Sequence, residues 1–202
     1  MSNENATAQL SEYDFIVVID ASGSMSTEDM PGGRSRWAYM QETAASFARD
    51  LGKLDSDGID VVIFGGSLIG THEGVNANKV TELFEMRSPR GGTPLAEALQ
   101  AAFKLAGKSD KKDFIIVFTD GVPDDKAAAA KAIIAQSQLQ ETDDALTILF
   151  VQVGRDAAAT AFLRSLDDDL VGAKFDIVDA KTQDEAEAFA TTADLIIAAI
   201  ND

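Results

Sequence analysis

The sequence predicts a Rossmann-like, doubly wound α/β domain, with a mostly parallel sheet, one antiparallel edge strand and helices on both faces. Two observations support this fold class. Short apolar runs such as residues 15–19 and 114–118 lack the polar alternation of a half-buried strand, which indicates strands covered on both faces, as in parallel sheets. These runs alternate along the chain with segments whose apolar residues recur at helical spacing.

The first half of the chain is expected to supply three strands and two helices. Trp37, Met40 and Ala44 begin the apolar stripe of the first helix. The glycine-rich stretch 65–70 is interpreted as a hairpin turn, because no phosphate-loop Lys-Ser or Lys-Thr pair follows it. The expected segments are a strand ending at Asp20, a polar loop at 26–36, a helix at 37–51, a strand at 59–64, an antiparallel hairpin at 67–75 and a helix at 78–86.

The second half continues the alternation of helices and strands. A helix at 94–107 ends in Gly107, a residue suited to the C-terminal cap. The further expected segments are a strand at 114–119, an alanine-rich helix at 125–140, a strand at 146–153, a helix at 157–166, an edge strand at 175–178 and one closing helix with Ala186, Phe189, Ala193, Ile197 and Ile200 on one face. That apolar face indicates core packing rather than a membrane or partner surface.

Length and composition predict a single domain over residues 12–202, preceded by a flexible tail at 1–11. With 202 residues the chain can bury one sizeable core, and it has no cysteine for disulfides, thiolate metal sites or a cysteine nucleophile. The first residues lack the basic segment and apolar core of a signal peptide, and no apolar run approaches the ~20 residues of a membrane span. We therefore expect a cytoplasmic protein that is a monomer by itself.

The charge balance limits the classes of partner. Thirty-four acidic and seventeen basic residues give a net charge of −17, which repels nucleic acid and anionic lipid. We expect neither a nucleic-acid nor a membrane partner. The acidic surface either attracts cations and basic partners or serves solubility alone.

Polar side chains follow the first strand at alternate positions. Asp20, Ser22 and Ser24 can turn three oxygen ligands toward one point, and oxygen donors suit Mg²⁺, Ca²⁺ or Mn²⁺. Taken alone, this triplet is equally well explained as turn chemistry, because Asp, Ser and Gly form local hydrogen bonds in strand-to-helix connections.

Two further segments favour the metal site. Thr93 stands before a helical pattern, and Asp120 ends the second buried strand, although an N-cap and a turn would explain each separately. Right-handed crossovers allow the two strands to be neighbours at the point where strand order reverses, and ligand crevices open there. Asp20 and Asp120 are then expected side by side.

These five positions resemble the metal-ion-dependent adhesion site of von Willebrand factor A domains, a family that includes the inserted domains of integrins. The resemblance extends from about Tyr13 onward and implies that fold. It implies direct coordination by Ser22 and Ser24, coordination by Thr93 directly or through water, and action of Asp20 and Asp120 through bound water. Mg²⁺ is the favoured cation, with Ca²⁺ and Mn²⁺ as alternatives.

The function implied by the resemblance is a metal-dependent adaptor, in which a partner's Glu or Asp completes the coordination sphere, and not an enzyme. Small bacterial members of the family work beside AAA+ ATPases or in stress operons, which suggests similar partners here. The alternative is a haloacid-dehalogenase-like phosphohydrolase with Asp20 as nucleophile, but that family needs a second carboxylate where Ser22 stands. Serine hydrolysis is disfavoured because the only histidine, His72, lies in the edge hairpin.

The long loop after the first strand is expected to flank the metal and to filter partners. It exceeds the usual ~2–6 residues of such a connection. Glu28 and Asp29 would repel an acidic side chain, whereas Arg34 and Arg36 could pair with acids around the partner's coordinating carboxylate. A loop without this role is the alternative.

Overall fold

A computed structural model describes residues 3–53 and 58–202 of the chain. Within these residues one six-stranded sheet has the order β3-β2-β1-β4-β5-β6. All neighbouring strands pair in parallel except β2 and β3, which form the expected antiparallel hairpin. The strands are β1 Tyr13–Asp20, β2 Ile59–Gly65, β3 Leu68–Val75, β4 Lys112–Thr119, β5 Leu146–Gln152 and β6 Val178–Thr182.

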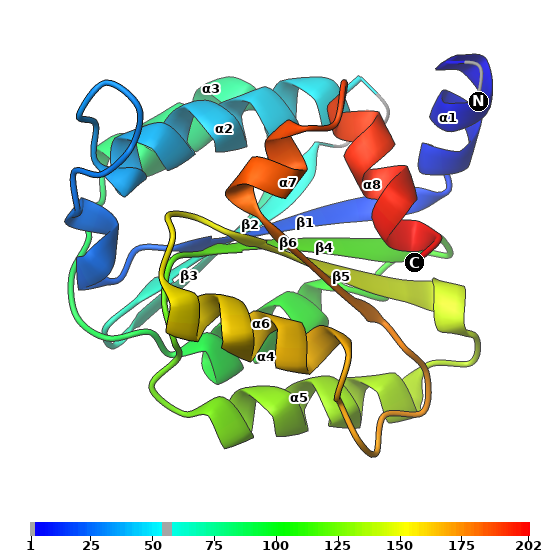
Figure 1. The fold of residues 1–202 in the computed structure, drawn as a ribbon. Helices are drawn as coiled ribbons and strands as arrows, with labels where there is room; N and C mark the ends of the chain where they lie inside the picture. The colour runs from blue at the N-terminus through cyan, green and yellow to red at the C-terminus, as the bar shows by residue number, and fades with distance from the viewer. Residues whose placement is uncertain (1–2, 54–57) are drawn as a thin grey trace.

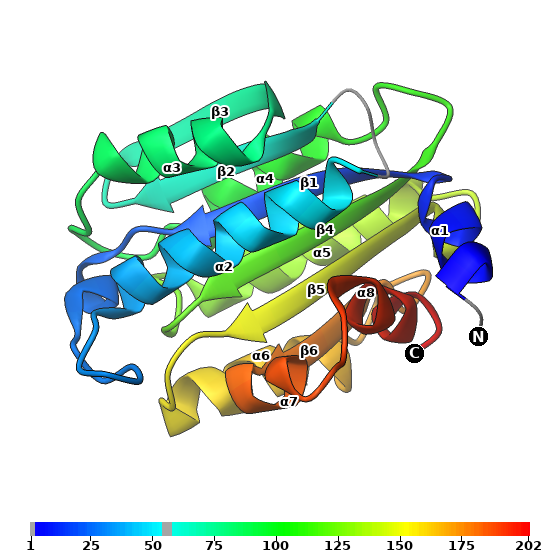
Figure 2. The same cartoon turned by 90° about the horizontal axis from the view of Figure 1, so that it is seen from above.

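Helices cover both faces of this sheet (Figure 1). The helices α2, α3, α7 and α8 lie on one face, and α4, α5 and α6 lie on the other, as the view from above also shows (Figure 2). Their bounds are α1 Asn3–Leu10, α2 Arg36–Leu51, α3 Ala77–Glu85, α4 Leu95–Leu105, α5 Lys126–Leu139, α6 Ala157–Asp167, α7 Gln183–Glu187 and α8 Thr192–Ile200. The predicted fold class is therefore confirmed.

The two-residue period of the strands divides the core into two layers. In β1, Val17 and Ile19 pack into the layer under α2 and α8, whereas Ile16 and Val18 pack into the layer under α4, α5 and α6. Each of these four side chains is at most 2% exposed. The continuous apolar run is explained by this burial on both faces, because successive side chains of a strand point to opposite sides.

The end of the chain differs from the prediction in two places. The last strand is β6, Val178–Thr182, rather than residues 175–178, because the ladder with β5 begins only where Val178 lies opposite Ile148. The single closing helix is instead the pair α7 and α8. Thr182 forms a capping box with Glu185 and starts α7, and Thr191 accepts a hydrogen bond from the Asp194 backbone to start α8.

The predicted tail at residues 1–11 is also corrected. Helix α1 occupies Asn3–Leu10, and Leu10 at its end is fully buried in the core layer that contains α8 residues. Burial of a leucine stabilises its position by roughly 1.5–3 kcal/mol, which accounts for the docking of this segment. The folded domain thus begins before residue 12.

Candidate metal centre

The two strands that end in carboxylates are neighbours. β1 pairs with β4 in parallel, with Ile19 opposite Phe118, so Asp20 and Asp120 meet at the carboxyl edge of the sheet. The Thr119 hydroxyl joins the two strand ends by donating to Asp20 Oδ2 at 2.7 Å. Strand order reverses between these two strands, so the expected position of the site at that reversal agrees with the structure.

Hydrogen bonds connect four of the five predicted residues. The Ser22 backbone N–H donates to Asp20 Oδ1 at 2.7 Å, and the hydroxyls of Ser22 and Ser24 lie 3.1 Å apart. The Ser24 hydroxyl donates to Asp120 Oδ1 at 2.7 Å. A short 3₁₀ turn, Gly23–Ser26, brings Ser24 back toward the strand end. The sequence pattern and the observed cluster therefore agree.

Thr93 reaches the same edge through its backbone. The Gly23 N–H donates to the Gly91 carbonyl at 3.0 Å, which attaches the loop of Thr93 to the serine turn. Gly91 has a φ of 74°, and a β-carbon there would lie 2.5 Å from Cα of Gly66. Only glycine permits this approach of two loops. The hydrogen bonds of the Thr93 carbonyl come from Leu95 and from Asp124, whose N–H lies 3.0 Å away.

Asp124 is a residue whose position the sequence did not reveal. A β-carbon on Gly92 would lie 2.4 Å from Asp124 Oδ2, so this exposed carboxylate packs directly over the residue before Thr93. The sequence signal for Asp124 was only that a further acidic residue follows Asp120, and a turn explains such a residue equally well. In the fold it adds an acidic group beside the predicted ligands.

Burial makes negative charge on the two site carboxyls energetically costly. Asp20 is 0% and Asp120 is 1% exposed. Burial raises the pKa of Asp20 to about 6, and repulsion from Asp120 adds to this, although hydrogen bonds from Thr119 and Ser22 oppose the rise. Two buried carboxylates with serine and threonine hydroxyls form a set of hard oxygen donors that fits a divalent cation, whose charge would offset theirs.

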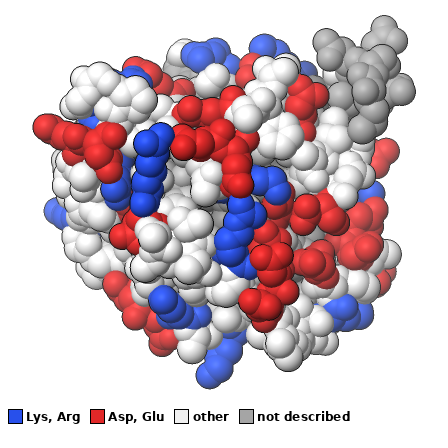
Figure 3. Space-filling view, viewed as in Figure 1, with Lys and Arg blue, Asp and Glu red and all other residues white. Residues whose placement is uncertain are grey.

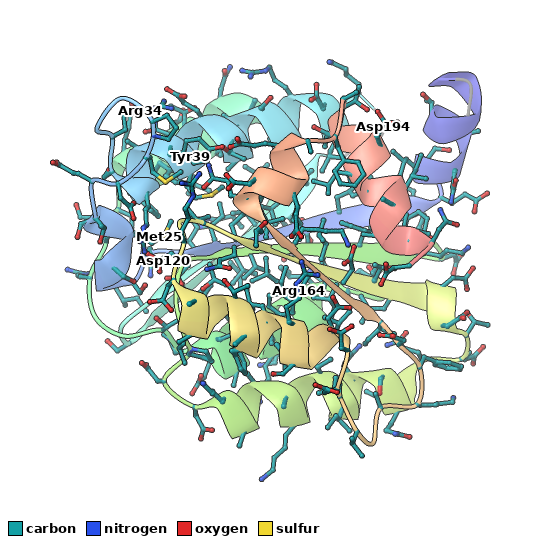
Figure 4. All side chains as sticks on the ribbon, viewed as in Figure 1. Met25, Arg34, Tyr39, Asp120, Arg164 and Asp194 are labelled. Atoms are coloured by element: carbon teal, nitrogen blue, oxygen red, sulfur yellow. The ribbon has the colours of Figure 1, made fainter. Side chains whose placement is uncertain are left out.

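Arg36 is the important residue that sequence reasoning placed wrongly. It does not extend toward a partner, because its side chain is 12% exposed and its Nη1 lies 2.9 Å from Asp120 Oδ2. Its other donors bind Asp29, and these hydrogen bonds hold the pKa of the Asp29 carboxyl below its usual value. Arg34 is more exposed and pairs with Glu42 on α2. Figure 4 shows Arg34 on the outer loop, apart from Asp120.

The competing catalytic arrangements gain no support from the geometry. His72 lies on β3, and β2 separates that strand from β1. The residue at the position of the required second carboxylate is Ser22, which is buried and engaged with Ser24 and Asp20. The described hydrogen bonds of Asp20 thus serve the turn and the neighbouring strand.

Acidic side chains are numerous on the face shown in Figure 3, in agreement with the net charge. Among the described residues, Asp167, Asp179 and Asp202 bring carboxylate oxygens within 4.8 Å of one another. Lys181 already donates to Asp179, and the Ala180 N–H donates to Asp167. Arg164 lies 3.8 Å from Asp167, whereas Asp179 Oδ2 is buried without a hydrogen-bond partner in the described part of the chain. The positive charges of Lys181 and Arg164 therefore offset only part of the negative charge around β6.

With this geometry established, comparison with known proteins places the fold. Residues 15–122, a range that contains all five site positions, match the von Willebrand factor type A domain. The chain belongs to this family. The domain match and the sheet architecture agree on a fold used for metal-dependent adhesion and protein interaction. No curated protein matched the chain.

Several solved structures are similar to this domain. Manganese-loaded TRAP protein of Plasmodium vivax has a TM-score of 0.62 at 18% identity, over 91% of this chain and 74% of that one. A mutant of the PilB minor pilin of Streptococcus sanguinis has a TM-score of 0.64 at 13% identity, over 94% and 60%. The pilus adhesin SpaC of Lactobacillus rhamnosus GG has a TM-score of 0.56 at 16% identity, over 94% and 30%. The likeness shows the shared fold.

Within residues 3–53 and 58–202, no helix is long and apolar enough to cross a bilayer.

Proposed function

We propose that this von Willebrand factor type A domain is a divalent-cation-dependent adaptor that binds an acidic side chain of a protein partner. The observation that carries the proposal is the continuous hydrogen-bonded set of Asp20, Ser22, Ser24 and Asp120 at the carboxyl edge of the sheet. Thr93 lies buried in the adjoining loop. Such oxygen donors suit Mg²⁺ first and Ca²⁺ or Mn²⁺ as alternatives.

The hydroxyl and carboxylate residues would have different roles in binding the cation. Ser22, Ser24 and Thr93 would hold the cation through uncharged oxygens, while Asp20 and Asp120 supply negative charge and orient water. The bound cation would act as a Lewis acid toward a partner's Glu or Asp. Ser24 is exposed, so a partner can approach from that side. No residue in this set is assigned a catalytic role.

The partner is proposed to be a protein that presents a Glu or Asp, with an AAA+ ATPase or a stress-operon protein as the classes to examine first. The adaptor is further proposed to act in the cytoplasm and to be a monomer by itself. A Plasmodium relative of this fold has been obtained loaded with manganese, which supports trying Mn²⁺ alongside Mg²⁺.

A matched pair of serine substitutions tests the proposal. Ser24→Ala removes a hydroxyl of the set, whereas Ser26→Ala removes a hydroxyl of the same turn that donates only to the Gly23 carbonyl. Calorimetry with Mg²⁺ and Mn²⁺ should show binding in the wild type and in Ser26→Ala, and much weaker binding in Ser24→Ala. Free metal at ten times the dissociation constant should stabilise the wild type by about 1.4 kcal/mol.

Partner capture is then measured with and without chelator, using the same three proteins. Capture that is lost with chelator and in Ser24→Ala, but kept in Ser26→Ala, supports the adaptor. Wild-type protein without any metal response, or a Ser24→Ala variant that binds metal as the wild type does, would refute it. Metal-dependent phosphate release that Asp20→Asn abolishes would establish the phosphohydrolase instead.

A further inference from the structure

Arg36 occupies a position built for its guanidinium group. Nη1 donates to Asp120 Oδ2 at 2.9 Å, while Nε and Nη2 donate to the carboxylate of Asp29 at 2.9 and 2.6 Å. The group packs against Gly154, where a β-carbon would lie 2.7 Å from both Cζ and Nε. Any larger residue at Gly154 would displace the guanidinium. An accidental surface ion pair would have no such enclosure.

The contacts of Asp120 show what this arginine does for the metal centre. Asp120 has 0% side-chain exposure, and both of its oxygens are engaged, Oδ1 by Ser24 and Oδ2 by Arg36. A buried carboxylate without a counter-charge is strongly destabilising. In the absence of a divalent ion, Arg36 is the cation that meets this need.

We propose that Arg36 is a resident counter-cation of the metal centre: it neutralises Asp120 in the metal-free protein and competes with the divalent ion for that carboxylate. This inference rests on the proposed function, because it concerns the same site. Two positive charges near one carboxylate repel each other, so Arg36 lowers metal affinity. The arginine thereby sets the metal concentration at which the site fills.

The same side chain couples the site to the loop before α2. Arg36 is the first residue of α2, and its backbone N–H donates to the Thr27 carbonyl at 2.9 Å. Its guanidinium forms a bidentate pair with Asp29, in which Nε donates to Oδ1 and Nη2 donates to Oδ2. If the Arg36 guanidinium moves closer to Asp29, its hydrogen bond to Asp120 weakens, and a move toward Asp120 weakens its hydrogen bonds to Asp29. Loop position and metal affinity are therefore linked, and the linkage is reciprocal.

The inference predicts opposite changes for two variants. Arg36→Met keeps the length of the side chain but removes its charge, so the metal-free protein should melt at a lower temperature while Mg²⁺ and Mn²⁺ bind about tenfold more tightly. Asp29→Asn leaves Arg36 with Asp120 as its charged partner, so the metals should bind several-fold more weakly. Arg34→Met is the matched control, because Arg34 pairs with Glu42 on the surface, and both quantities should stay at wild-type values.

Calorimetric metal titration and melting curves in chelator supply the two readouts. Metal affinity of Arg36→Met equal to or weaker than that of the wild type would overturn the inference. If Arg36→Met does not fold, Asp29→Asn decides: affinity that is unchanged or tighter overturns it. If Arg36→Met binds metal and the wild type does not, the result would support this inference and refute the proposed function. If neither protein binds metal, the inference and the proposed function are both refuted.

Discussion

Replacement of Asp20 by Asn is expected to stabilise the metal-free protein at pH 8 while abolishing its metal response. Asp20 is fully buried, and burial raises the pKa of its carboxyl to about 6 from its ordinary value of 3.8. A raised pKa means that the neutral form favours folding. This stabilising contribution is fully present below pH 3.8 and is lost as the pH rises through about 6.

The magnitude follows from the size of the pKa shift. The difference between a pKa of 3.8 and one of about 6 corresponds to roughly 3 kcal/mol of unfolding free energy at pH 8. Asparagine carries no charge and can satisfy both partners, because its Oδ1 accepts from the Ser22 N–H and its Nδ2 donates to the Thr119 hydroxyl, which can also accept. We expect a net gain of about 2 kcal/mol, or ~4–8 °C in melting temperature for a chain of this size.

Melting curves in chelator at pH 8 and pH 4 measure this gain, and the exposed Asp110→Asn serves as the control. The stabilisation should be present at pH 8 and nearly absent at pH 4, because Asp20 is largely neutral in the folded wild type at pH 4. Saturating Mg²⁺ at pH 8 should raise the wild-type melting temperature but leave Asp20→Asn unchanged. An Asp20→Asn variant that melts below the wild type at pH 8, or a difference independent of pH, would refute this reasoning.

Two further predictions concern the loops and the opposite edge of the sheet. Gly91→Ala should lower the free energy of unfolding by about 2 kcal/mol or more and weaken metal binding, because the added β-carbon would collide with Gly66. Gly107 has a similar φ of 72° but open space around it, so Gly107→Ala should cost only about 1 kcal/mol of backbone strain. Equal losses of stability in urea unfolding of the two variants would contradict this prediction. Burial raises the pKa of Asp113 to about 6, so its stabilising contribution is lost as the pH rises through about 6, and Asp113→Asn should stabilise the protein by about 1 kcal/mol at pH 8, after allowance for solvent screening, but not at pH 4. Unfolding curves at the two pH values check this, and a destabilised variant at pH 8 would disprove it.

The sequence by itself determined the fold class, and it predicted five residues of the candidate site. Strands buried on both faces need unbroken apolar runs, and residues 15–19 and 114–118 carry that pattern locally. The polar positions at the ends of these runs lie at one edge whenever the two strands are parallel. The proximity of Ser22, Ser24 and the two aspartates could therefore be predicted before any contact was known. The glycines in residues 65–70 likewise predicted the antiparallel hairpin of β2 and β3.

Local patterns were insufficient at the end of the chain. Residues 175–178 are apolar enough for a strand, but pairing with β5 selects Val178–Thr182 instead. The apolar face shared by Ala186 and Ile197 has helical spacing, yet the cap at Thr191 divides it into two helices. Strand pairing and capping involve specific partners, so periodicity alone did not locate these boundaries.

Tertiary structure alone decided the electrostatic state of the site. Arg36 and Asp120 are 84 positions apart in the chain, and their ion pair depends on β1 and β4 being neighbours and on the space beside Gly154. From the sequence, Arg36 could equally face a partner. Burial at the strand ends removes the solvent that would otherwise stabilise the carboxylates, so the guanidinium is drawn inward to pair with Asp120.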